Sequence, residues 1–189
     1  MTTNIPKLTP PTPVSPIMLM HTPNIESHIL YWAQERGILE HGSITGQTLK
    51  TISEIGEFSD AVLGDNLEGI LDAIGDIGVC VTILSHMLGS SLTELRAEAR
   101  PRTLRSLETA ALALCGLAGF LAEDIARGDH AHARIHLTEI LEVLLGIGTD
   151  SDSPILDADF AGCLCDAYEI ISKRTGSMCA GGTFIKDEA

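Results

Sequence analysis

Two aspartates in an otherwise apolar segment are the first residues that could do chemistry. Asp72 and Asp76 lie in ILDAIGDIGVCV, residues 70–81. On a helix, at about 100° per residue, they share a face and lie one turn apart. An ionised carboxylate among Ile and Val is costly unless a positive group satisfies it, and Lys and Arg are scarce in the neighbouring sequence. The segment therefore indicates a metal cation as the partner of these aspartates.

A second acidic pair lies in QTLKTISEIGE, residues 47–57. On a helix, Gln47, Lys50, Glu54 and Glu57 fall within an arc of about 80°. Glu54 and Glu57 are about 4.5 Å apart along the axis, so their oxygens can converge on Mg²⁺, which prefers oxygen ligands. Two acidic pairs on neighbouring helices predict a site that holds phosphate oxygens and activates water. Taken alone, the second pair also suits a solvated helix face with a Lys50–Glu54 ion pair.

Composition and charge narrow the class of protein. The chain has 189 residues, of which 44% are hydrophobic and 4% aromatic, and this suits an aliphatic helical core. Its 26 acids and 12 bases give a formal charge of −14, which disfavours a nucleic acid polymer or an anionic membrane as a partner. No signal-peptide pattern and no CxxC spacing occur, so we expect a cytoplasmic protein with reduced cysteines: Cys80, Cys115, Cys163, Cys165 and Cys179.

The patterns predict an all-α fold, a helical bundle of about five to six main helices. Residues 1–22 carry most of the prolines and are predicted to be a disordered or extended arm. Residues 23–189 are predicted to form a single helical domain without strands. On its second helix we expect the buried face to be Leu49, Ile52, Ile55, Ser59 and Val62. The expected helices, with Thr22 and Asp157 as the first and last N-caps, are 22–36, 47–63, 67–88, 93–99, 103–127, 130–146 and 157–174.

A weak internal echo suggests a degenerate duplication. GEFSDAVLGDN (56–66) and GFLAEDIARGDH (119–130) align with one gap, and each leads into an apolar helix. In this alignment Leu117 and Phe120 stand opposite the two glutamates of the first copy. We therefore expect an acid-bearing half at about 23–90, a second half without the acids at about 91–175, and a C-terminal tail at 176–189.

Three motifs together carry a family resemblance. WAQERGI (32–38), QxxKxxxExxE (47–57) and DAIGDIGV (72–79) resemble the MazG-like all-α nucleoside triphosphate pyrophosphohydrolases, in particular their phage-type branch. The C-terminal segment 163–188 is also similar to the end of those phage proteins. The resemblance covers both ends of the chain, and the part at about 92–155 is much less recognisable.

The resemblance implies a function and a set of metal ligands. It implies a helical bundle, at least dimeric, that binds Mg²⁺ or Mn²⁺ and hydrolyses a (deoxy)nucleoside triphosphate to the monophosphate and pyrophosphate in the cytoplasm of a bacterium or a phage-infected cell. By position, Glu54, Glu57 and Asp76 match the family's metal-binding acids. The family's next acid falls on Ala73, so Asp72 is taken as its substitute.

One further departure from the family leaves the general base open, because Ser53 replaces the first acid of the family's EExxE. For the substrate we favour a purine deoxynucleotide such as dGTP, while dUTP, dCTP and an alarmone remain open. The alternative function is a catalytically weak or inactive bundle that binds nucleotides or a protein. A di-iron bundle is disfavoured, because the chain has no Glu-x-x-His.

Several other residues have a functional and a structural interpretation. Lys50, together with Gln47, could hold a phosphate, or it could only pair with its neighbouring glutamate. Trp32 could stack on a base or belong to the core. The candidates for contact with the triphosphate near the C-terminus are Lys173, Arg174 and Lys186, which could equally lie in solvent. A stripe of His132, His136 and Glu139 is better explained as an exposed helix face than as a metal site.

The second half carries a long apolar run, ALALCGLAGFLA (111–122). This is more apolar surface than one face of a small bundle needs to bury. We therefore expect a homodimer or a homotetramer, in which cations of the C-terminal region could reach a neighbouring chain's substrate.

Overall fold

The computed structural model describes residues 7–179 and 184–187. Within them the chain is almost entirely helical, as predicted, and its helices of twelve or more residues number six. The elements in chain order are α1 (Pro16–Leu19), α2 (Thr22–Glu35), α3 (Ile38–His41), α4 (Ile44–Leu63), α5 (Leu67–Met87), α6 (Leu92–Glu98), α7 (Leu107–Arg127), α8 (His130–Ile147), α9 (Phe160–Ile171), β1 (Gly176–Met178) and β2 (Phe184–Lys186).

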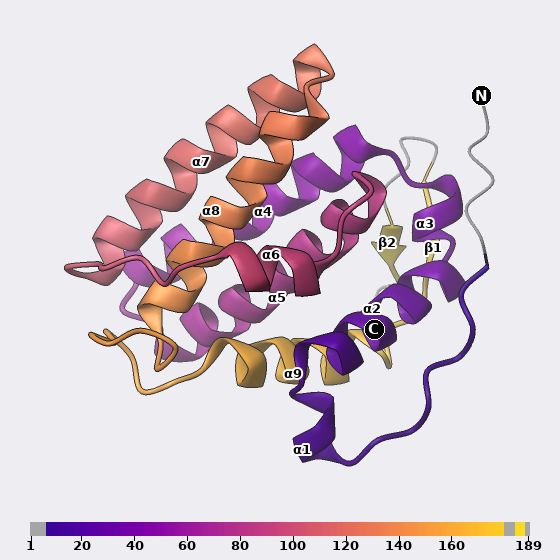
Figure 1. The fold of residues 1–189 in the computed structure, drawn as a ribbon, viewed down its shortest axis with the longest axis horizontal. Helices are drawn as coiled ribbons and strands as arrows, with labels where there is room; N and C mark the ends of the chain where they lie inside the picture. The colour runs from indigo at the N-terminus through magenta and orange to yellow at the C-terminus, as the bar shows by residue number, and fades with distance from the viewer. Residues whose placement is uncertain (1–6, 180–183, 188–189) are drawn as a thin grey trace.

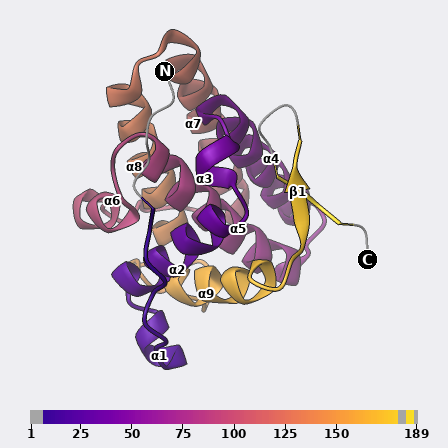
Figure 2. The same cartoon turned by 90° about the vertical axis from the view of Figure 1, so that its right-hand side faces the viewer.

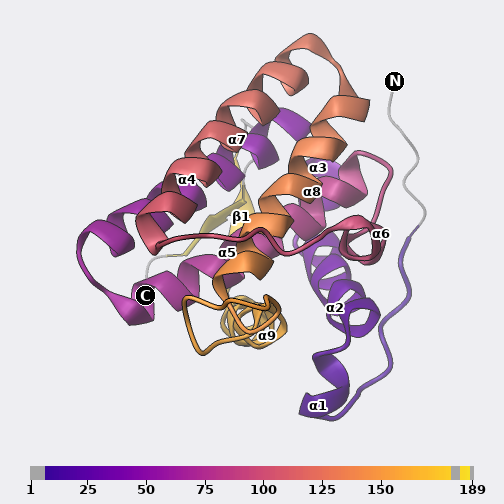
Figure 3. The same ribbon diagram turned by 60° about the vertical axis from the view of Figure 1, so that its left-hand side comes forward.

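Four long helices, α4, α5, α7 and α8, pack together as the centre of the bundle (Figure 1). The hairpin α4–α5 is the half that carries the acids, and α7–α8 is the half that lacks them. The two hairpins meet mainly through α4 and α7, which run side by side in Figure 3. On the other side, α9 packs against α5, and α2 packs against α5, α6 and α9. Buried aliphatic side chains from both halves form one hydrophobic core.

Local caps determine where the helices begin, and they correct several predicted boundaries. The second main helix begins at Ile44, because the Ser43 side chain accepts a hydrogen bond from the Gly46 amide. α7 begins only at Leu107, after its cap Ser106. The cap of α9 is Asp159, not Asp157. The residue before α2 is His21, so Thr22 is the first residue of the helix instead of its cap.

The C-terminal hairpin contradicts the prediction that no strand forms. β1 and β2 pair antiparallel, with Ser177 opposite Ile185. The strands have three residues each, too few for the alternation that marks a strand in the sequence.

The described part of the proline-rich arm has no helix or strand over residues 7–15, as predicted for an extended segment. It then forms the short helix α1, which was not predicted and which Ser15 caps. Further upstream, the backbone of Leu8 exchanges two hydrogen bonds with the side-chain amide of Gln34 on α2. Prolines therefore do not prevent this segment from contacting the bundle; residues 1–6 of the arm lie outside the described part.

The buried face of α4 differs from the predicted one. Ile55 and Val62 are buried as expected, but Leu49 is 62% exposed and Phe58 is completely buried. The helix packs against α5 on one side and α7 on another, so two arcs of its surface are covered. As a result Glu54 is only 3% exposed, whereas Lys50 and Glu57 of the same polar arc are exposed.

Candidate functional site

A pocket of about 470 Å³ lies where α2, α4, α5, α9 and β2 meet. Figure 2 shows how the hairpin follows α9 and stands beside α4. The pocket brings together eight of the ten predicted site residues. Its lining consists of an acidic group (Glu54, Glu57, Asp72, Asp76), two cations (Lys50, Arg174), an aromatic and aliphatic group (Trp32, Ile38, Val79, Ile83, Ile171, Phe184, Ile185), and Gln47 and Cys80.

The four acids lie between two hollows. They line the pocket, and they also line a neighbouring hollow of about 510 Å³ that extends to the turn between α4 and α5. Glu54 is buried, whereas Glu57 and Asp72 are exposed. Asp60 adds a further carboxylate to the second hollow. The acidic group therefore borders two hollows, and not the pocket alone.

The electrostatics of the acidic group show an excess of negative charge. Burial, the charge of Glu54 and the charge of Asp72 raise the pKa of Asp76 to about 6, against the opposing effects of Arg174 and Lys50. Lys50 forms an ion pair with Glu54. Burial would lower the pKa of Lys50, but the hydrogen bond and charge of Glu54 outweigh this effect and raise it. Four carboxylates thus share two cations.

The residues fit a divalent cation by charge and by donor chemistry. All four donors are carboxylates, the ligands that Mg²⁺ and Mn²⁺ prefer. Within the described ranges, however, no three His, Cys, Asp or Glu side chains are close enough to form a ready ligand set. The Glu54 carboxylate already forms an ion pair with Lys50. A cation held here would require the carboxylates to turn toward one another, away from that ion pair.

The other end of the pocket is apolar and aromatic. Trp32 meets Phe184 edge to face, with ring centroids 6.0 Å apart. The indole Nε1 of Trp32 is buried and has no acceptor in the part of the chain that the structure describes. Gln47 is 9% exposed, and its side-chain amide also has no hydrogen-bond partner among the described residues. Both polar groups are available to a ligand with a flat, partly polar moiety.

Arg174 is positioned by a residue that the sequence patterns did not single out as functional. The backbone oxygen of Arg174 accepts hydrogen bonds from Nε of Arg36 at 3.1 Å and from its Nη2 at 2.8 Å. Arg36 lies at the end of α2, 138 residues away in the sequence. It fixes the start of the segment that leads from α9 to the hairpin. Its place in WAQERGI was the only signal in the sequence.

Cys80, Ile38, Phe184 and Ile185 also line the pocket without having been predicted. Burial and the charge of Glu54 raise the pKa of Cys80, so its thiol is protonated and is no nucleophile. The three apolar residues come from α3 and β2, elements that carry no periodic signal of their own.

One predicted substrate contact is not part of this pocket, and the side chain of a second lies outside the described part of the chain. Lys173 is exposed and does not line it. Lys186 is the last residue of β2, and its side chain lies outside the described part. Two members of the predicted histidine stripe form pairs with carboxylates: His132 with Asp129, and His136 with Asp124.

Comparison with known proteins gives no relative from which a role could be transferred. No protein-family model, curated protein sequence or solved structure matches this chain. The likeness to the MazG-like enzymes is therefore an expectation that depends on the sequence motifs alone.

Proposed function

We propose that the pocket hydrolyses a (deoxy)nucleoside triphosphate to the monophosphate and pyrophosphate, with Mg²⁺ or Mn²⁺ as cofactor. One observation supports this most: a group of four carboxylates and two cations adjoins an aromatic and aliphatic compartment within a single pocket. A triphosphate needs the charged group, and a nucleoside suits the aromatic and aliphatic compartment. The sequence resemblance points to the same activity.

Each group of residues has a role in this proposal. Glu54, Glu57, Asp72 and Asp76 would hold the cation, which when bound neutralises phosphate charge and lowers the pKa of a water nucleophile. Lys50 and Arg174 bind phosphate oxygens. Trp32 and Phe184 bind the base, and Gln47 donates or accepts hydrogen bonds at its edge.

The preferred substrate in this proposal is a purine deoxynucleotide such as dGTP. The Trp32 Nε1–H can only donate, so it suits a base that presents an acceptor. Guanine meets that requirement through O6 and N7, but adenine and the pyrimidines also present acceptors, so this contact favours a nucleobase without selecting one, and the purine preference stays a prediction from the sequence.

A second candidate is a nucleotide-binding bundle without turnover. It is favoured by the absence of a ready ligand set within the described ranges. The ion pair between the exposed Lys50 and the buried Glu54 would then persist both without and with a bound nucleotide.

The deciding experiment is a nucleotide panel. Purified protein is incubated with each (d)NTP and Mg²⁺, and monophosphate, pyrophosphate and orthophosphate are measured separately. We expect monophosphate and pyrophosphate in equal amounts, and no reaction in excess chelator. Asp157→Asn, a change in an exposed loop, is the control and should retain activity. Orthophosphate from an intact dNTP would overturn the proposed cleavage site, and saturable binding without products would favour the second candidate.

A further inference from the structure

The pocket and the second hollow adjoin along the α4–α5 hairpin and together form a trough. The acidic group lines both spaces and stands where they join. From Glu54 the pocket extends along α4 to Gln47, and from Glu57 the second hollow extends to Gly64. At 1.5 Å per residue, each part is about 10 Å long. The trough therefore continues beyond the acidic group in both directions.

The pocket is the nucleoside end of this trough. Trp32 and Gln47 lie there, and Gln47 is 9% exposed with no hydrogen-bond partner for its side-chain amide among the described residues. Lys50 and Arg174 line the pocket and not the second hollow. A nucleotide whose base lies in the pocket therefore places its first phosphate beside these cations. The rest of its phosphate chain points past the acidic group into the second hollow.

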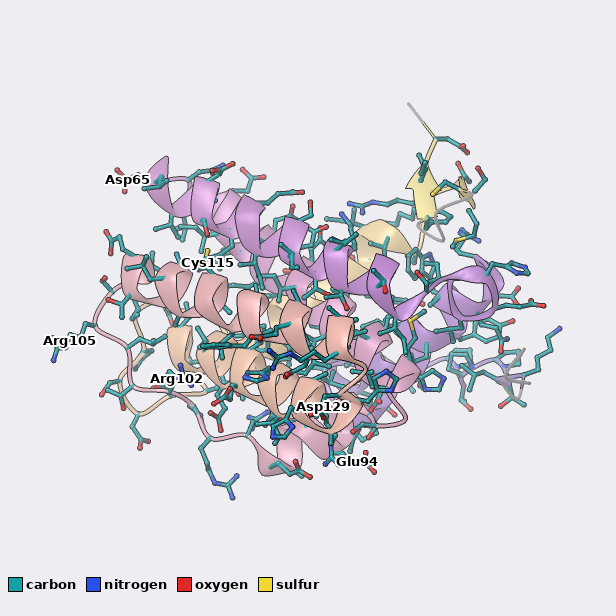
Figure 4. All side chains as sticks on the ribbon, turned by 90° about the horizontal axis from the view of Figure 1, so that it is seen from above. Asp65, Glu94, Arg102, Arg105, Cys115 and Asp129 are labelled. Carbon is teal, nitrogen blue, oxygen red and sulfur yellow. The ribbon has the colours of Figure 1, made fainter. Side chains whose placement is uncertain are left out.

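The second hollow is larger than the leaving diphosphate needs. Its volume is about 510 Å³, compared with about 470 Å³ for the pocket, although a diphosphate is much smaller than a nucleoside. Gly64 and Asn66, which line its end, are exposed. Figure 4 shows Asp65, in the turn between them, at an outer end of the ribbon. A group attached to the terminal phosphate thus has both room and a way out to solvent.

The charges of the second hollow do not match a free terminal phosphate. None of the described residues that line it is a Lys, Arg or His. Binding sites that select a phosphate dianion hold it by charge-assisted hydrogen bonds from such side chains. The lining instead contains five carboxylates: Glu54, Glu57, Asp60, Asp72 and Asp76.

We propose that the second hollow binds an alcohol esterified to the terminal phosphate of the substrate, with a preference for a cationic aminoalkyl group. The site would then hydrolyse nucleoside polyphosphates whose terminal phosphate carries a substituent. This inference rests on the proposed function, because it takes the cleaved bond to be the one between the α and β phosphates. Esterification removes a negative charge from the terminal phosphate and an ammonium group adds a positive one, so both changes reduce repulsion by the carboxylates.

The reaction needs no reactant besides water. The water oxygen forms a bond to the α-phosphorus, and the bond from that phosphorus to the bridging oxygen breaks. The bridging oxygen keeps the electron pair and leaves with the β-phosphate, and one proton of the water passes to the solvent. The products are the nucleoside monophosphate and the esterified pyrophosphate.

Asp60 is the residue of this proposal that can be changed without touching the nucleoside end. It lines the second hollow and not the pocket, and it is exposed. It lies about one helical turn beyond Glu57, on the side of the acidic group away from Lys50. Its charge therefore acts on the substituent more than on the base or the first phosphate.

Three substrates test the proposal: dGTP, its γ-hydroxyethyl ester and its γ-aminoethyl ester, or the same series on the dNTP that the nucleotide panel selects. Release of the monophosphate measures kcat/KM. The fluorescence of Trp32, the single tryptophan, measures the dissociation constants of the non-hydrolysable α,β-methylene analogues. We expect kcat/KM of the hydroxyethyl ester to stay within about ten-fold of that of dGTP, because loss of a charge-assisted hydrogen bond would cost more. The aminoethyl analogue should bind about three-fold or more tightly than the hydroxyethyl analogue.

Two variants with equal charge changes locate the effect. Asp60→Lys should abolish or reverse the preference for the aminoethyl analogue and should tighten binding of the free triphosphate analogue. Asp152→Lys changes an exposed loop residue that lines neither space, and it should keep the wild-type preference. Circular dichroism of both variants confirms that the helices are retained.

The outcomes separate this inference from the proposed function. If dGTP is hydrolysed but esterification lowers kcat/KM by more than about ten-fold, this inference is wrong and the proposed function stands. Equal affinities for the aminoethyl and hydroxyethyl analogues, or a preference that Asp60→Lys retains, would also overturn the inference alone. Absence of hydrolysis of all three substrates would overturn both.

Discussion

Asp76 holds its charge at a cost to the stability of the fold. Its pKa, about 6 instead of the usual 3.8, means that the folded protein binds this proton more tightly than the unfolded chain does. The corresponding stabilisation is complete below about pH 3.8 and is lost as the pH rises to about 6. Above that range the ionised carboxylate destabilises the protein, as expected for a residue kept for binding.

Asp76→Asn removes that cost and should also remove activity. At about pH 8 we expect the variant to be more stable by about 1–2 kcal/mol, less than the full pKa shift implies because solvent partly screens the group. The advantage should shrink as the pH falls from about 6 to about 4. Urea unfolding at several pH values measures this. A variant that is less stable at every pH, with activity per folded molecule intact, would make Asp76 a structural residue.

At the scale of elements, Arg36 connects α2 to the end of α9. Two hydrogen bonds to the Arg174 carbonyl hold the point from which the chain leaves the bundle toward the hairpin. That hairpin places Phe184 against Trp32. A single contact thus positions both a cation and the aromatic end of the pocket, although Arg36 does not line it.

Arg36→Ala should therefore impair substrate binding more than it impairs folding. Loss of two partly buried hydrogen bonds from a charged donor should lower the free energy of unfolding by about 1–2 kcal/mol. We expect KM to rise by about ten-fold with a smaller change in kcat, because Arg174 and the base compartment lose their position.

Two variants provide the controls for this effect. Arg36→Lys keeps one donor and should lie between wild type and Arg36→Ala. Arg105→Ala removes an arginine that points away from the bundle (Figure 4) and should change neither constant. If kcat fell while KM stayed constant, Arg36 would act on the reaction step and not on position.

The same elements show what the sequence could predict. The long helices and the acidic group were predicted because 3.6-residue periodicity is a local signal, whereas the predicted caps Thr22 and Asp157 were wrong. The exposure of Leu49 was not predicted, because periodicity cannot tell which of two apolar arcs a neighbouring helix covers. The contact between Arg36 and Arg174 joins residues 138 apart in the chain, so no local pattern contains it. The hairpin that supplies half of the aromatic compartment is equally a product of tertiary packing.

At the scale of the whole molecule, two sources of negative charge destabilise the fold. One is the formal charge of −14, and the other is the excess of carboxylates over cations in the pocket. General repulsion among distant carboxylates is screened by any salt, since the Debye length is about 10 Å at 0.1 M. The acidic group differs, because four carboxylates there share two cations and Glu54 is buried. A divalent cation bound at that group stabilises the folded state in addition to screening.

Thermal unfolding can separate general screening by salt from specific binding of a divalent cation. In about 5 mM MgCl₂ the wild type should unfold at a temperature about 3 °C or more above that in NaCl of equal ionic strength, since 1 kcal/mol corresponds to about 2–4 °C for a chain of this size. Asp76→Asn should lose this difference and Asp157→Asn should keep it, while both still respond to NaCl. Equal unfolding temperatures of the wild type in the two salts would mean that the acids bind no divalent cation without substrate. A difference that persists in Asp76→Asn would place the cation elsewhere on the chain.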